Sequence, residues 1–515
     1  MIYNSVIIGS VFALLQRLKA AYGGSITAKL LKNMYLGTKS IFANSSIWSF
    51  IKRGDFFSRV WEYSGVYKIF SWAMNVLPVF LRRLYFKFED IFSDSLIVGL
   101  LKDMLRRFEV LVALCLVIAV IVPHEPWSDK YSIILVVFLA FMYFMKAIFY
   151  RYEGFDLKAI DFALFIFSVL VVLSSATSVF PGESIKFLLL YFTSFLLVLV
   201  IVSSIKTERS LGLFLDIFLI GVTISGLYGI WQAKVVGIPV NPAYTDIITN
   251  SNATGRVFST MGNPNNYAEI LVLTIPFYLA VIFNSKTFVK RIVFALLALP
   301  PMLALIWTGS RSAWISFAVS VLILTFFKNK KLIPLLILIG LMCIPVLPQS
   351  VYRRIMSLSN FSADTSAQYR ILIYKTVWPM LKDYWVTGVG LGTDAFMKIC
   401  DNYYQFTKKT PPHSHNIFLQ IWLELGFMGV LSFVWFIVRM IKKSVINIFS
   451  KTDKYINNIL IAGISAIAGI LVMGIAEYVW YYPRVMLIFW MVVGIILAGL
   501  SIANGRREGF SQKNV

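Results

Sequence analysis

Charged residues and cysteines are scarce in this chain of 515 residues. Only 14% of the residues are charged and 58% are hydrophobic, which gives a mean hydropathy of +0.76. Soluble domains carry about 25% charged residues, so this composition excludes an ordinary soluble protein and indicates a membrane protein. There are three cysteines: Cys115 and Cys343 lie in apolar runs, and only Cys400 falls in a polar loop. A disulfide framework and a CxxC metal site are therefore excluded.

We expect no cleavable signal peptide at the N-terminus. Val6–Leu15 is a short apolar stretch whose positive charges follow it, and no small-residue cleavage site comes next. The net charge of +23 comes from 48 Lys and Arg against 25 Asp and Glu. In so apolar a chain this excess fits cytoplasmic loops beside an anionic bilayer, so we expect the lipid bilayer, and no nucleic acid, as a partner.

Apolar runs long enough to cross a membrane recur through most of the chain. A membrane-spanning helix needs roughly 17–25 apolar residues. The candidate segments are Glu109–Pro123, Tyr131–Tyr150, Ile160–Phe180, Ile185–Ser204, Leu211–Gln232, Tyr267–Asn284, Ile292–Thr308, Ala313–Phe327, Leu332–Pro348, Ile417–Met440, Ile456–Tyr478 and Val485–Ala503. The sequence therefore predicts an all-α, polytopic membrane protein with about twelve transmembrane helices.

The chain before these segments has a different character. Residues 1–107 mix short aromatic and aliphatic clusters with many Lys and Arg, and no run there is long enough to span. We expect basic amphipathic helices on the cytoplasmic membrane face; the alternative is a partly disordered arm. The membrane domain then covers residues 108–504, and residues 505–515 form a basic cytoplasmic tail.

The basic residues also predict the topology. Clusters of Lys and Arg occupy alternate loops, which by the positive-inside rule face the cytoplasm together with both termini. The predicted location is the cytoplasmic (inner) membrane. Two long loops then face outward, 233–266 and the larger extracytoplasmic loop 349–415. Loops of this length without obvious structure are usually functional or disordered, so we look for the site there.

Histidine is rare as well, and two of the three histidines stand together. His413, His415 and Asn416 follow two prolines and lead directly into an apolar segment. Histidine exchanges a proton near neutral pH, so this segment is a candidate for catalysis, with His415 as the base and His413 as a possible helper. The alternatives are helix capping, which Asn416 suits better, and a metal site, for which only His124 remains as a further histidine.

Arginines on the predicted outward loops run against the positive-inside rule. Arg256, Arg311 and Arg370 have this position, and each has a planar fork of donors that suits phosphate. The alternatives are interfacial anchoring and loop salt bridges. Glu477 adds a carboxylate to the last outward turn, and Arg484 in the same turn is predicted to anchor a helix end.

Several short motifs in this order resemble the O-antigen ligase and O-antigen polymerase superfamily of bacterial envelope glycan transferases. The resemblance covers about Tyr267–Met440, and the twelve-helix layout is similar to the ligase branch. The motifs are Gly262–Asn265, Gly309–Ala313, Arg370 with Tyr374 and Trp378, Gly388–Gly390, and His415–Leu419 leading to Glu424–Gly426. For Glu424, Gly426 and Gly429 alone, close helix packing is the simpler interpretation.

The resemblance implies a metal-independent glycosyltransferase of C-type fold that needs no cofactor. Its donor would be a glycan on a polyprenyl diphosphate of the undecaprenyl type, and its acceptor a glycan, a lipid or a wall polymer. A histidine matching His415 would act at the acceptor hydroxyl, while arginines matching Arg256, Arg311 and Arg370 would hold the diphosphate. From the residues themselves, Asn416 and Glu477 are possible helpers, and a single in-line displacement predicts inversion at the anomeric carbon.

Two other functions stay open at this point. A repeat-unit polymerase of the same superfamily would share the donor and differ in its acceptor. A lipid or polysaccharide transporter would place its polar groups in mid-membrane. The predicted helices carry few such groups, Asp216 and Glu269 among them, and this favours the transferase.

Overall fold

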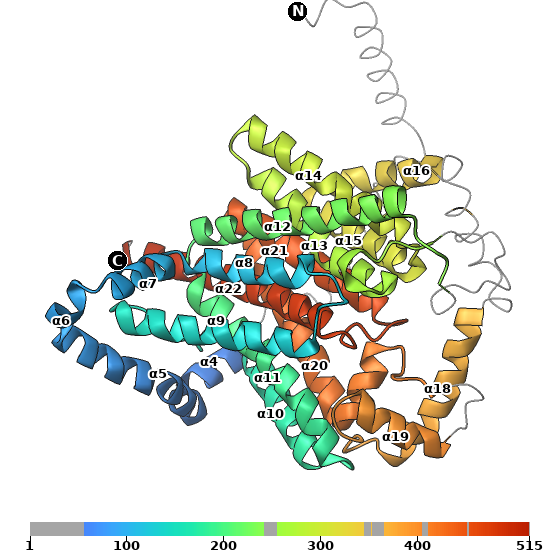
Figure 1. Ribbon diagram of the computed structural model, residues 1–515, viewed down its shortest axis with the longest axis horizontal. Helices are drawn as coiled ribbons and strands as arrows, with labels where there is room; N and C mark the ends of the chain where they lie inside the picture. The colour runs from blue at the N-terminus through green and yellow to red at the C-terminus, as the bar shows by residue number, and fades with distance from the viewer. Residues whose placement is uncertain are drawn as a thin grey trace, which may run out of the picture. The chain divides into compact units, whose positions relative to one another are not determined.

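The computed structural model describes residues 56–241, 255–343, 352, 365–403, 410–450 and 453–513. The chain divides into residues 1–56 and a second unit, Phe57–Val515, to which the following description applies. In the described residues the regular structure is helical throughout, as expected for an all-α protein (Figure 1). The α-helices are α4 (Phe56–Tyr63), α5 (Gly65–Lys87), α6 (Glu89–Ser93), α7 (Leu96–Arg106), α8 (Phe108–Ile121), α9 (Asp129–Phe149), α10 (Phe162–Ala176), α11 (Pro181–Ser204), α12 (Glu208–Trp231), α13 (Pro264–Asn284), α14 (Phe288–Trp307), α15 (Arg311–Asn329), α16 (Ile333–Cys343), α18 (Thr365–Asp383), α19 (Thr393–Tyr403), α20 (Ile417–Ser450), α21 (Lys454–Met473) and α22 (Pro483–Lys513).

Helices α13, α21 and α22 form the centre of the membrane domain (Figure 1). Helix α21 packs against α13 on one side and α15 on the other, while α22 packs against α11. The three central helices are apolar around most of their circumference, and most of their residues are buried. Helices that are hydrophobic all round belong in the interior, with more amphipathic helices around them.

Every predicted apolar segment overlaps one of these helices, but the number of spans is not confirmed. Eight helices of the described part are long and apolar enough to cross a membrane: α9, α11, α12, α13, α14, α20, α21 and α22. Helices α8 and α10 are apolar but have only 14 and 15 residues. The described chain is thus a polytopic membrane protein, and a count of twelve spans remains a prediction.

The described part of the N-terminal region consists of helices α4 to α7. They expose large apolar side chains, among them Ile69, Trp72 and Leu96, which are 65%, 66% and 77% exposed. Arg82 ties α5 to the end of α9, because its guanidinium donates to the carbonyl of Ala147 at 2.8 Å. The prediction for residues 1–55 lies outside the described residues, and the interfacial position of α4 to α7 stays a prediction.

The described helices have two chemically different ends. At the basic end, Glu153 pairs with Lys146 (3.2 Å) and Lys206 (2.8 Å), and Arg439 pairs with Asp161 (2.8 Å). The opposite end, here called the site end, contains the first residues of α13 and α15 and the turn after α21. Helices α15 and α21 run antiparallel, since Lys328 bonds Asn458 near one end and Ser316 lies against Gly469 further along. The first residues of α15 and the last residues of α21 therefore lie together at the site end.

The described part of segment 349–415 folds into α18 and α19 with a small core of its own. Ile373, Val377 and Met380 of α18 pack against Phe396 and Cys400 of α19. Our expectation that Cys400 lies in a polar loop is wrong, because it is fully buried in α19. The polar residues around it occupy the other face of an amphipathic helix, which a simple inspection of composition does not separate.

Candidate active site

The segment before α20 holds His415 at the start of a helix. Asn416 caps this helix, since its side-chain oxygen accepts hydrogen bonds from the backbone N–H groups of Phe418 (2.9 Å) and Leu419 (3.1 Å). Its amide nitrogen donates to the carbonyl of Ile475 at 3.0 Å. Asn416 therefore performs the capping that could have been the role of His415, and it ties this segment to the turn after α21.

His415 has an unusual backbone conformation. Its φ is +51°, one of two positive values among the described non-glycine residues. This left-handed conformation disfavours side chains with a Cβ atom, and such positions concentrate at functional sites. Two hydrogen bonds hold it: the backbone N–H of His415 donates to His413 Nδ1 (3.1 Å), and the hydroxyl of Tyr374 donates to the carbonyl of His415 (3.4 Å).

Glu477 is the point at which the site residues meet. Its Oε2 lies 3.2 Å from Nδ1 of His415, and its Oε1 accepts from Arg370 at 2.6 Å and from Asn265 at 3.4 Å. Arg370 also donates to the carbonyl of Ala476 at 2.9 Å, which fixes its position beside the carboxylate. The structure thus brings together residues of α13, α18 and the segment before α20 on one side chain of the turn after α21.

The electrostatics of Glu477 keep it ionised. Burial by itself would raise the pKa of this carboxyl, but the hydrogen bond from His415 and the charge of Arg370 outweigh it and lower the pKa to about 2. An ionised carboxylate only accepts hydrogen bonds, so the hydrogen of a neutral His415 is assigned to Nδ1. Nε2 then carries the lone pair, and His415 is arranged to accept a proton there.

His413 differs from its neighbour. Its side chain is buried. The centre of its ring lies 4.2 Å from the ring centre of His415 and 4.6 Å from that of Tyr481. Burial and the nearby His415 hold the pKa of His413 well below its usual range. A neutral His413 suits the hydrogen bond that its Nδ1 accepts from the His415 backbone, so His413 supports the loop.

The remaining predicted arginines lie at the same end of the molecule. Arg256 donates to the side chain of Asn265 at 2.5 Å and to the carbonyl of Thr308 at 2.6 Å. It thus connects Asn265, which bonds Glu477, with the turn between α14 and α15. Arg311 begins α15 at this turn, and the antiparallel packing of α15 on α21 places it at the site end. Arg256 is thus linked to Glu477 through a single side chain.

Arg484 and His124, which the sequence analysis also considered, contact groups outside the Glu477 cluster. Arg484 is fully buried and donates to the carbonyls of Val122 (2.6 Å) and Thr260 (3.0 Å), as expected of a residue that anchors a helix end. His124 contacts the hydroxyl of Tyr482. Among the described residues no group of three or more His, Cys, Asp and Glu side chains is placed to hold a metal ion.

Glu424 lies at the centre of a buried hydrogen-bond network behind the site. Its carboxyl accepts from Gln420 (3.0 Å), Tyr478 (3.1 Å) and Tyr191 (3.3 Å). Gln420 in turn accepts from the backbone N–H of Ser414 at 2.8 Å. The network connects α20 and α11 to the histidine segment, so Glu424 has more than the packing role suggested by its glycine neighbours.

Asn265 and Tyr374 belong to motifs that carry the resemblance, but our sequence reasoning gave neither of them a role in the site. Nothing in the motif Gly262–Asn265 pointed to Glu477, which lies 212 residues from Asn265. The Gln420 and Glu424 pair was detectable, because residues four apart lie on the same side of a helix.

Comparisons with known proteins match a region that contains part of this site. Residues 292–434 match a family model described as O-Antigen ligase, and this region contains Arg311, Arg370 and His415. Arg256 and Glu477 lie outside it. The chain is also similar to the "ComP-specific O-oligosaccharyltransferase" of Acinetobacter baylyi, with 26% identity over 219 residues, 41% of this chain and 38% of the relative.

Rickettsial proteins give a similar result. The "Putative polysaccharide ligase" of Rickettsia conorii is 27% identical over 160 residues, 29% of this chain and 39% of the relative. That of Rickettsia felis is 26% identical over 171 residues, 32% of this chain and 39% of the relative. The chain thus spans about two fifths of the length of the curated relatives it matches. Over residues 292–434 the chain is therefore similar to the O-antigen ligase family, and its similarity to these ligases and to the oligosaccharyltransferase supports the resemblance to the O-antigen ligase superfamily.

Proposed function

We propose that this protein is a membrane glycosyltransferase that moves a glycan from a polyprenyl diphosphate to an acceptor hydroxyl. The observation that carries the proposal is the contact of His415 and Arg370 with the two oxygens of Glu477, at 3.2 and 2.6 Å. A side chain that can accept a proton thus lies near one of the type that binds phosphate, and this supports the proposal. The names of the relatives, an oligosaccharyltransferase and polysaccharide ligases, support a ligase-type transfer.

In the proposed reaction, Nε2 of His415 removes the proton of the acceptor hydroxyl as its oxygen attacks the anomeric carbon. The bond from this carbon to the diphosphate oxygen breaks, and the diphosphate leaves with the bonding electrons. A single displacement of this kind inverts the configuration at the anomeric carbon. Glu477 stabilises the imidazolium that forms, in the way a carboxylate supports a catalytic histidine elsewhere.

In this proposal, arginine side chains stabilise the leaving group. Arg370 and Arg311, with Arg256 beside them, would stabilise the negative charge that develops on the diphosphate, a task that a divalent metal ion performs in other transferases. Arginine remains cationic in any surroundings and binds phosphate oxygens in pairs. We therefore expect transfer to continue in the presence of EDTA.

The decisive experiment is transfer by purified protein in detergent from undecaprenyl diphosphate bearing a glycan. His415→Ala should lower the turnover by at least about 100-fold, since general-base catalysis contributes on the order of 10²–10⁴-fold. The control is that His415→Ala is inserted in the membrane and is as abundant as the wild type. Undiminished turnover in His415→Ala would remove His415 from the mechanism. Release of undecaprenyl diphosphate in a single compartment also distinguishes a transferase from a transporter.

A further inference from the structure

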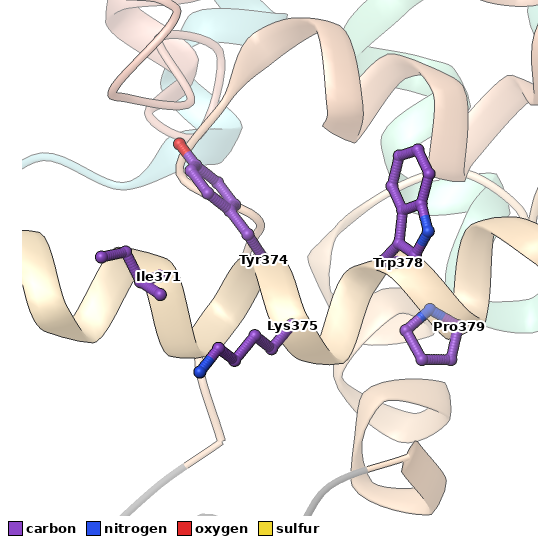
Figure 2. Close-up of a pocket in the computed structure, with 5 residues that line it drawn as sticks. All are labelled: Ile371, Tyr374, Lys375, Trp378 and Pro379. Atoms are coloured by element: carbon purple, nitrogen blue, oxygen red, sulfur yellow. The ribbon is translucent and has the colours of Figure 1, made fainter.

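One face of α18 forms a shallow groove next to the candidate site. Ile371, Tyr374, Lys375, Trp378 and Pro379 line a hollow of about 480 Å³ (Figure 2). Their spacing of three, four, seven and eight residues puts them on one side of the helix, opposite the buried face that packs against α19. The volume lies in the usual range for ligand sites, roughly 300–1,000 Å³.

The groove is continuous with the site through Tyr374. The hydroxyl of this residue donates to the carbonyls of His415 (3.4 Å) and Ile475 (3.2 Å), while its ring forms part of the groove wall. Arg370, one turn earlier on the same helix, bonds Glu477. With a rise of about 1.5 Å per residue, Trp378 lies roughly 12 Å along the helix axis from Arg370.

The groove contains two aromatic side chains, the exposed Trp378 and the half-buried Tyr374. Tyr374 and Trp378 project from the same side of α18 (Figure 2), and 59% of Trp378 is exposed. Aromatic rings have an electronegative face, which suits the weakly positive C–H groups on one side of a pyranose ring. The exposed ring of Trp378, next to the half-buried ring of Tyr374, is thus suited to hold a sugar whose hydroxyl groups stay in water.

We propose that this groove binds the glycan chain of the lipid-linked donor. The inference rests on the proposed function, because the donor diphosphate is expected at Arg370. A glycan attached to that diphosphate would pass over Tyr374 and reach Trp378 with a sugar beyond the first. The donor is favoured over the acceptor as occupant, since the phosphate-binding arginine and both aromatic residues belong to the same helix.

The test compares two donors that differ only in glycan length. The probes are undecaprenyl diphosphate bearing one N-acetylhexosamine and the same carrier bearing a tetrasaccharide. Their dissociation constants are measured with purified protein, and transfer is measured separately. Trp378→Ala should weaken binding of the tetrasaccharide donor roughly three- to tenfold and leave the single-sugar donor unchanged. Trp378→Tyr should restore most of the affinity.

Trp385→Ala is the matched control. Trp385 is 53% exposed and lies a few residues further along the chain, outside the groove. Equal affinities of wild type and Trp378→Ala for the tetrasaccharide donor would overturn the inference, even where wild-type transfer is intact. An equal loss in both tryptophan variants with both donors would also overturn it and would assign these rings to the bilayer surface. Length-dependent binding without any transfer would support the groove and contradict the proposed function.

Discussion

Glu477 accepts hydrogen bonds from side chains of three separate parts of the chain. Its two oxygens accept from His415, Arg370 and Asn265, although 62, 107 and 212 residues separate these from it in sequence. A carboxylate in this position orients the imidazole and also holds the guanidinium that we assign to the diphosphate. Removal of its charge should therefore affect the proton acceptor and the leaving group together.

The first prediction concerns this charge. Glu477→Gln keeps the size of the side chain but cannot stabilise an imidazolium, so we expect turnover to fall on the order of 100-fold. Steady-state transfer with the wild type, Glu477→Gln, His415→Ala and the double variant measures it. Residues that act as a unit are not additive, so the double variant should lose little more than His415→Ala alone. Independent, multiplying losses would show that Glu477 acts apart from His415.

The second prediction concerns the pH dependence of stability and His413. Its folded pKa lies well below its usual value near 6.5 because the ring is buried, so at mildly acid pH the unfolded chain binds a proton that the folded protein does not. Stability due to this residue is complete above pH 6.5 and falls as the pH drops, by up to about 1.4 kcal/mol per pH unit. We expect the thermal midpoint of His413→Asn to decline less than that of the wild type between pH 7.5 and 5. Parallel declines would contradict this role.

At the scale of elements, α20 contains a break at Gly426, where the segment after α18 packs against it. Gly426 has φ +74° and ψ −177°, a conformation that is essentially restricted to glycine. A Cβ atom here would stand 1.8 Å from the carbonyl oxygen of Val386, in the segment that follows α18. The break therefore lets α20 and this segment approach closely, with Val389 donating its N–H to the carbonyl of Leu423 at 2.6 Å.

The third prediction is that Gly426→Ala destabilises the protein. Backbone strain and the clash with Val386 act together, so we expect a loss of about 3 kcal/mol or more, seen as a lower thermal midpoint or a lower yield of folded protein. Gly99→Ala in α7 is the control, because a Cβ atom at Gly99 meets nothing within 4 Å. Alanine there should be neutral or slightly stabilising. An unchanged midpoint in Gly426→Ala would show that the break is not needed.

The elements were more predictable from the sequence than the contacts between them. All twelve apolar segments overlap helices, since hydrophobic run length reports a local property of the chain. His415 and Arg370 could be chosen by residue type and predicted topology. The link from Arg256 through Asn265 to Glu477 could not, because it depends on how α13 and the turn after α21 pack together. The broken helix at Gly426 also depends on a distant segment.

For the molecule as a whole, the clusters of Lys and Arg in alternate loops predict its orientation in the membrane. Lys146, Lys206 and Arg439 belong to ion pairs at the basic end, whereas Glu477 and its partners occupy the site end. Basic loops stay in the cytoplasm, so the site end should face outward. A lipid-linked donor suits that side, because nucleotide sugars are absent there.

The last prediction tests this orientation with single cysteines and a membrane-impermeant maleimide. Tyr152, at the basic end, is 95% exposed, and Lys382, near the end of α18, is exposed as well. Lys382→Cys should be labelled in cells whose outer envelope layers have been made permeable but whose cytoplasmic membrane is intact. Tyr152→Cys should be labelled only after the cytoplasmic membrane is permeabilised. Both variants are made in a Cys343→Ser background, and this background protein is the blank, since its remaining cysteines, Cys115 and Cys400, are buried. The reverse pattern would put the site on the cytoplasmic side, where a donor carried on the outer leaflet could not reach it.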